Sequence, residues 1–240
     1  MKKAIAVMKK DLKEISRNFQ VFGVMIFIPI VFGVALPIII AVIAAAIPPG
    51  DPEGKLALTF IVDLYGGFIL MIAVIIPTVV ASDSFAGEKE RKTIEALLAA
   101  PISDSELFLG KVLVSFVPTI ILTYLSATIF SVLVNLSLGT FLLPDLNFIY
   151  ILLAAPLVAL LAIELTVFVS VKVKGFREAQ QLAGVIIIPI ILIVVLNTIN
   201  ISVFIFPWNI IFFAVLIGAD IGLYGLAIKK FGRENIISKI

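Results

Sequence analysis

The stretch GEKERKTIEALLAAPIS, residues 87–103, is a charged segment that lies between two long apolar runs. Its Glu, Lys, Leu and Ala residues are strong helix formers. Pro101 disfavours a helical conformation in the residue before it, so the run ends there. The residues from Ser103 to Glu106 have the pattern of a capping box, which starts a new helix. We therefore predict a short helix over 87–101, a sharp turn, and then a second helix.

The rest of the chain is too apolar for an ordinary soluble domain. Of its 240 residues, 62% are hydrophobic and 14% are charged, whereas soluble domains are about 25% charged. A bilayer can cover this much apolar surface if the spans are helical. We therefore expect an all-α membrane protein with a single transmembrane domain over 1–240.

The composition also excludes several kinds of chemistry. The chain has no Cys and no His, which excludes disulfides, thiolate or imidazole metal sites and histidine acid–base catalysis. It has no GxxxxGK[ST] motif, so it is not itself a P-loop ATPase. We expect no catalytic residue, no metal and no cofactor bound by this chain, and no nucleic-acid partner.

Six apolar segments are long enough to cross a bilayer, which takes about 20 residues. They are 20–47, 57–82, 107–136, 148–171, 182–199 and 208–228. Of the 18 Lys and Arg residues, all except Lys55 fall in four alternate regions: 1–19, 83–111, 172–181 and the C-terminal tail. Positive residues favour the cytoplasmic side. The sequence therefore predicts a multi-pass protein of the cell membrane with both termini in the cytoplasm.

The first 19 residues have the pattern of an amphipathic helix. Apolar residues recur at steps of three and four on one face, and lysines cover the other face; the apolar residues are Ile5, Met8, Leu12, Ile15 and Phe19. Such a helix lies in the membrane interface with its apolar side down. It either anchors the first span only, or forms an elbow that also contacts a cytoplasmic partner.

The predicted helix at 87–101 carries an apolar patch on a charged background. Ile94, Leu97 and Leu98 fall at helical spacing, and Glu88 and Arg91 are each four residues before an oppositely charged residue. A simple connector needs no such patch. The helix either lies on the membrane surface or inserts into a groove on another protein.

The residues FAGEKERKTIEALLAAPIS (85–103), followed by ELFLGK (106–111), resemble the signature of ABC transporter permeases of the type-2 exporter class. That family shows a Glu-x-Glu-Arg-x-x-x-Glu-x-Leu-Leu run, a Pro-Ile/Val-Ser turn, and Gly-Lys at the head of the third span. The matching residues here are Glu88, Glu90, Arg91, Thr93, Glu95, Leu97, Leu98, Pro101, Ser103, Gly110 and Lys111. The six-span layout and the N-terminal helix are also similar to the family.

The resemblance implies that 87–101 is a coupling helix. In that family the segment docks on a separate ATP-binding subunit, which carries ATP and Mg, and passes its movement to the spans. The matched residues, together with Ile94, would then form the docking surface. The resemblance also implies a second copy of this chain or a homologous permease, and export of a substrate. The few charges within the spans favour a hydrophobic or amphipathic substrate.

Three acids lie inside apolar runs, at Asp63, Glu164 and Asp220. Intramembrane acids are candidates for a transport route. For Glu164 and Asp220 the alternative is a buried hydrogen bond between helices. Asp63 lies near the outer end of its span, where it can reach water.

Two other functions compete with the permease hypothesis. A self-contained secondary transporter or channel, without an ATPase partner, would use ion sites in mid-membrane, but it leaves 87–103 unexplained. A membrane-embedded enzyme ranks last, because the spans carry no clustered polar motif.

Overall fold

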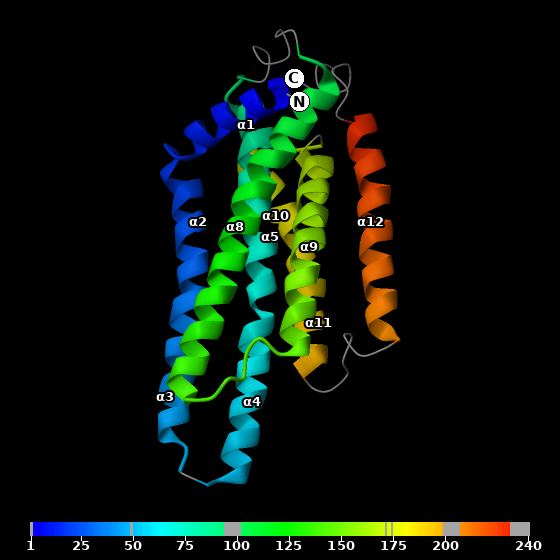
Figure 1. The fold of residues 1–240 in the computed structure, drawn as a ribbon. Coiled ribbons are helices and arrows are strands. Elements are labelled where there is room, and N and C mark those ends of the chain that lie inside the picture. The colour runs from blue at the N-terminus through cyan, green and yellow to red at the C-terminus, as the bar shows by residue number, and fades with distance from the viewer. Residues whose placement is uncertain are drawn as a thin grey trace.

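The computed structural model describes residues 2–48, 50–93, 102–170, 172–173, 175–198 and 207–230, and this part of the chain is helical and contains no strand (Figure 1). Six helical segments are long and apolar enough to cross a membrane, which confirms the predicted number of spans. They are Phe19–Ala46, Pro52–Glu90, Asp104–Leu138, Leu146–Ser170, Phe176–Leu196 and Trp208–Ala227.

A separate helix precedes the spans, and three of the spans are made of several pieces. The helix α1 (Lys2–Ile15) is followed by span one, which joins α2 (Phe19–Ile30), the π-helix η1 (Val31–Ala35) and α3 (Leu36–Ala46). Span two joins α4 (Pro52–Gly67), α5 (Ile69–Ser82), the π-helix η2 (Asp83–Gly87) and α6 (Glu88–Glu90). Spans three and four are α8 (Asp104–Leu138) and α9 (Leu146–Ser170). Span five joins α10 (Phe176–Ala183), the 3₁₀ turn η3 (Gly184–Ile186) and α11 (Ile187–Thr198), and span six is α12 (Trp208–Lys230).

The helix α5 forms the centre of the bundle. It packs against α2, α8, α9, α10 and α11, and nearly all of its residues are buried. A helix that is apolar on every side is stable only when it is surrounded. Spans one and six lie on the flanks and expose apolar side chains such as Phe27, Val42, Val215 and Ile221. Because the chain spans a membrane, these faces contact lipid.

The predicted start of span three is confirmed. The Ser103 side chain accepts a hydrogen bond from the backbone N–H of Glu106 at 3.3 Å and contacts the Glu106 carboxylate at 3.3 Å, which is a capping box. The 35 residues of α8 extend about 52 Å at 1.5 Å per residue. This exceeds the hydrocarbon thickness of about 30 Å, so one or both ends of α8 stand outside it.

The helix α1 lies across one end of the bundle, which we call the α1 end (Figure 1). The charged α6 and the start of α8 are at this end, and the α3–α4 and α8–α9 connections are at the opposite end. The described parts of the regions rich in Lys and Arg therefore lie on one side of the bundle, as the alternation of six spans requires.

The helix α1 packs on α8 through a stripe next to its predicted apolar face. Ala4, Val7, Asp11 and Ile15 are buried, whereas Ile5 is 40% exposed, and Phe19 at the start of α2 is 90% exposed. The exposed apolar residues are therefore available to the membrane interface.

Gly110 permits the close crossing of α1 over α8. A Cβ atom at this position would lie 2.7 Å from the carbonyl oxygen of Ala4 and 2.8 Å from Cβ of Val7. The first of these contacts is with backbone, which cannot rotate away.

We expect Gly110→Ala to displace α1 from α8 and to lower the thermal stability of the purified protein, because overpacking costs about 1–3 kcal/mol. The matched control is Gly218→Ala on α12, where a Cβ would meet nothing within 4 Å. Differential scanning fluorimetry in one detergent compares the two variants. Equal melting temperatures for Gly110→Ala and wild type would contradict the close packing.

Candidate functional site

A group of charged and polar side chains joins α1, the end of span two and the start of α8. We call it the charge cluster, and it consists of Lys10, Asp11, Glu14, Asp83, Ser84, Glu88, Arg91 and Lys111. It lies at the α1 end of the bundle, and two of its members, Glu88 and Arg91, belong to the segment 87–101.

Lys111 is the most deeply buried member of the charge cluster. Its side chain is fully buried on α8, and its Nζ lies 2.5 Å from Oε2 of Glu88 and 3.5 Å from Oδ2 of Asp11. It also donates a hydrogen bond to the backbone carbonyl of Ser84. A lysine is almost never fully buried unless it is paired. The pairing with Glu88 therefore explains how this charge is tolerated.

Glu88 bridges two helices. Its Oε2 contacts Lys111 on α8, and its Oε1 accepts a hydrogen bond from Nζ of Lys10 on α1 at 2.8 Å. Partial burial lowers the pKa of Lys10, but the hydrogen bond to Glu88 and the charges of Asp11 and Glu14 outweigh it, so the pKa lies above its ordinary value. Lys10 therefore stays charged, and one buried carboxylate holds α1 and α8 to the end of span two.

A second contact joins the same elements from the other side. Nη1 of Arg91 lies 2.8 Å from Oδ1 of Asp83, and its Nη2 lies 3.4 Å from Glu14. Asn18, the N-cap of α2, donates a hydrogen bond to the same Asp83 oxygen at 3.3 Å. A Cβ at Gly87 would lie 2.9 Å from that oxygen and 3.0 Å from Arg91 Nη1. Gly87 thus leaves room for the arginine to reach Asp83.

The helix of span two ends with a Schellman motif at Lys92. The Thr93 N–H donates to the Glu88 carbonyl at 3.0 Å, the Lys92 N–H donates to the Lys89 carbonyl at 3.1 Å, and Lys92 has φ of 57°. These are the 6→1 and 5→2 hydrogen bonds that close a helix. The last helical residue is therefore Glu90.

The prediction of one continuous helix over 87–101 is wrong, because the helix of span two runs through Gly87 and ends at Glu90. Glu88 and Lys111 are buried and contact other parts of the chain, and their assignment to a docking surface stays a prediction. The predicted i,i+4 pair of Glu88 with Lys92 would contribute only about 0.3–0.5 kcal/mol on an exposed surface. The buried contacts of Glu88 with Lys111 and Lys10 therefore decide its position.

The other predicted docking residues divide into two groups. Glu90, Arg91 and Thr93 are exposed at the end of the helix, and Gly110 contacts α1. The remaining members lie outside the described residues: Ile94, Glu95, Leu97, Leu98 and Pro101.

Glu90 contacts the segment that begins span five. Its Oε2 accepts a hydrogen bond from the backbone N–H of Phe176 at 2.9 Å, and Lys89 Nζ donates to the Val173 carbonyl at 3.4 Å. Gly175 is the N-cap of α10 and has no side chain to cap the helix. Glu90 supplies the missing acceptor from another element, and its negative charge at the N-terminus of α10 interacts favourably with the helix dipole.

The three intramembrane acids do not form one group. Glu164 on α9 and Asp220 on α12 are buried and interact electrostatically, and within the described residues Oε2 of Glu164 and both Asp220 oxygens have no hydrogen-bond partner. Asp63 instead lines a small pocket with Asp145. Asp145 precedes α9, and Glu164 lies about 28 Å further along it at 1.5 Å per residue.

Carboxylates of Asp11, Glu14 and Glu88 lie within 4.8 Å of one another, a spacing that suits a metal ion. However, Lys10 contacts all three of these carboxylates, and Lys111 contacts Asp11 and Glu88. The chain therefore supplies its own cations at this position.

Sequence reasoning missed Asp11, Asp83, Lys10 and Glu14 as members of the charge cluster. One signal was present: Asp11 lies on the same helical stripe as Ala4, Val7 and Ile15. A charge on an apolar stripe indicates a buried partner.

A sequence model of a protein family described as "ABC-2 family transporter protein" matches residues 5–206. The match covers most of the chain and includes the charge cluster and the first five spans. No curated protein sequence matches the chain.

We expect Lys111→Met to destabilise the protein by about 3 kcal/mol, because removal of one partner of a buried ion pair leaves the other charge uncompensated. The double variant Lys111→Met with Glu88→Gln should recover more than half of this loss. Lys9→Met, on the exposed side of α1, is the control and should change stability little. Denaturant unfolding in detergent measures these variants and the single variant Glu88→Gln. A loss in the double variant equal to the sum of the two single losses would show that the pair is not coupled.

Proposed function

Because the chain belongs to the ABC-2 family of transporter proteins and is a membrane-spanning permease, we propose that it couples ATP hydrolysis by a separate ATP-binding subunit to export of a substrate. The observation that carries this proposal is the charge cluster, which joins three helices directly beside the proposed docking segment. ATP and Mg are bound by the partner, and this chain contributes the route across the membrane.

The docking surface in this proposal is the segment after the Schellman motif. Leu97 and Leu98, with Ile94, supply an apolar patch for a groove on the ATP-binding subunit, and burial of such side chains dominates helix-in-groove recognition. Glu95 and Pro101 complete the segment. The left-handed residue Lys92 changes the direction of the chain between span two and this patch.

A movement of the docking segment has a short path into the membrane. Residue 93 hydrogen-bonds the backbone of Glu88, and α6 is continuous with η2 and the central helix α5. Glu88 links the same point to α1 and α8, and Glu90 links it to α10. A displacement at this point therefore acts on spans two, three and five together.

Orientation follows from charge. Almost all of the Lys and Arg residues that the structure describes lie at the α1 end, and the positive-inside rule assigns such an end to the cytoplasm. In this proposal both termini are cytoplasmic, and α1 lies in the interface with Ile5 toward lipid. Two permease chains, identical or homologous, bind two ATP-binding subunits. The apolar spans favour a hydrophobic or amphipathic substrate.

A second candidate function is ion-coupled transport without an ATPase. It is favoured by Oε2 of Glu164 and both carboxyl oxygens of Asp220, which are buried and have no hydrogen-bond partner among the described residues; intramembrane acids often mark ion or proton routes. It would require uphill transport by the chain alone, driven by an ion gradient and lost on Glu164→Gln.

We expect Leu97→Asp to abolish co-purification of a P-loop ATPase with the tagged chain, because a charge cannot enter an apolar groove without loss of several kcal/mol. The variant should still elute as a single species on gel filtration. Thr140→Asp, in the connection at the opposite end of the bundle, adds the same charge and should retain the ATPase. Quantitative mass spectrometry of the eluate measures the stoichiometry.

Two results would overturn the proposal. One is an ATPase bound equally by wild type and Leu97→Asp, which would remove the docking assignment. The other is a wild-type eluate that contains no ATPase in several mild detergents, which would give first place to the ion-coupled transporter.

A further inference from the structure

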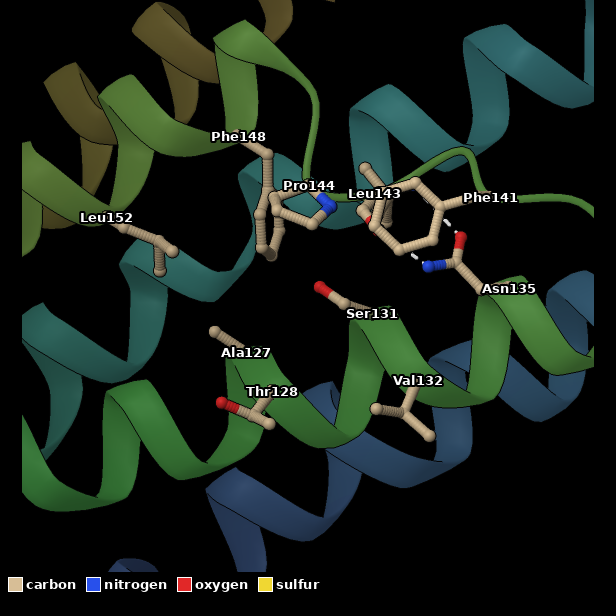
Figure 2. A pocket seen from close by; sticks show the side chains of 10 residues that line it. All are labelled: Ala127, Thr128, Ser131, Val132, Asn135, Phe141, Leu143, Pro144, Phe148 and Leu152. Atoms are coloured by element: carbon tan, nitrogen blue, oxygen red, sulfur yellow. Dashed lines mark hydrogen bonds between the residues drawn. The ribbon is translucent and has the colours of Figure 1, made fainter.

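A pocket of about 310 Å³ lies between the second half of α8, the α8–α9 connection and the first turns of α9 (Figure 2). Ala127 and Ser131 form its floor on α8, Phe148 and Leu152 form its wall on α9, and Phe141 lies at its edge. Its volume falls within the range of small-molecule sites, about 300–1,000 Å³. It is far from the charge cluster, which lies at the other end of the bundle.

The framework of this pocket is built from specific contacts. Oδ1 of Asn135 accepts hydrogen bonds from the backbone N–H groups of Leu142 and Leu143, both at 2.9 Å, and its Nδ2 donates to the Leu143 carbonyl at 2.5 Å. Phe148 stacks on Phe130 with ring centroids 6.1 Å apart. One side chain of α8 therefore fixes the position of the connection, and two aromatic rings close the inner wall.

The lining is almost entirely hydrocarbon. The Thr128 hydroxyl donates to the Tyr124 carbonyl of its own helix at 2.8 Å, and the Asn135 amide is occupied by the connection. Ser131 projects its hydroxyl into the pocket (Figure 2). A charged or strongly polar ligand would lose its hydration here without compensation, whereas an alkyl chain would not.

The pocket opens on a face of α8 that contacts lipid. Val132 is 50% exposed, Leu136 is 74% exposed and Phe141 is 86% exposed. Leu136, Phe141 and Leu146 (66% exposed) are exposed apolar residues at this end of α8, whereas the first turn of α8 is acidic, so the part of α8 that stands outside the hydrocarbon is its start. Ser131 lies seven residues before the end of α8, which is about 10 Å along the axis and less than half of the hydrocarbon thickness of about 30 Å. The medium at the mouth of the pocket is therefore the acyl-chain region of the leaflet on the α8–α9 side.

We propose that this pocket binds one acyl chain of a phospholipid from the leaflet on the α8–α9 side. The acyl chain lies along α8, with its end between Ala127 and Leu152. It fills a cavity whose lining residues otherwise lack contacts on one side, and it exchanges contacts with mobile lipid tails for contacts with a fixed apolar wall. The proposal requires only that the protein spans a bilayer, and it is independent of the ATP-binding partner.

The test uses the full-length chain reconstituted in phosphatidylcholine vesicles that contain phosphatidylcholine with a diazirine in one acyl chain. After irradiation, peptide mass spectrometry locates the label. We expect labelling of pocket residues to exceed that of Ile121, an equally lipid-exposed position on α8 (60% exposed), by roughly fivefold. The reason is that a fixed, well-packed site holds one chain longer than an open surface does.

Two variants fill the pocket from different points and keep the test interpretable if one fails to fold. Ser131→Phe and Ala127→Leu should each reduce pocket labelling to the level at Ile121. The control Ile121→Phe adds an aromatic ring to the same helix outside the pocket and should leave pocket labelling unchanged. The proposal is wrong if wild type labels the pocket no more than Ile121, or if a monodisperse pocket-filling variant is labelled as strongly as wild type.

Discussion

The ion pair between Lys111 Nζ and Glu88 Oε2 is the contact on which the rest of the α1 end depends. Both side chains are buried, so neither charge can return to water without separation of the helices that cover it. Glu88 also binds Lys10, and Lys111 also approaches Asp11 and Ser84. α1, α8 and the end of span two are therefore fixed relative to one another by charges that must stay together.

This arrangement gives the end of span two an unusual position. The same three residues of α6 contact α1 and α8 on one side and the start of α10 on the other. They also continue into α5, which is surrounded by other helices over its whole length. A buried helix in a well-packed bundle transmits displacement because its neighbours cannot deform independently. The family assignment and this geometry support the same interpretation, in which force enters at the α1 end.

The two ends of the bundle have different chemistry. At the α1 end, charged side chains hold helices together. At the opposite end, one amide, Asn135, positions the connection between α8 and α9 and leaves an apolar pocket open to the lipid face. Between them lie the buried acids Glu164 and Asp220. Among the described residues, Oε2 of Glu164 and both Asp220 carboxyl oxygens have no hydrogen-bond partner. A bilayer protein tolerates such groups where they serve a route or share a proton.

The sequence by itself determined the six spans, the alternation of charge between the two ends and the capping box at Ser103, because apolar length, charge distribution and caps are local properties. The tertiary structure decided which stripe of α1 is buried, where the helix of span two ends, and that Glu88 and Lys111 bind each other. The burial of Glu88 depends on residues far from it in the sequence, namely Lys111, 23 positions away, and Lys10, 78 positions away. An exposed helical ion pair contributes a few tenths of a kcal/mol, whereas an unpaired buried charge costs several, so long-range pairing overrides the local pattern.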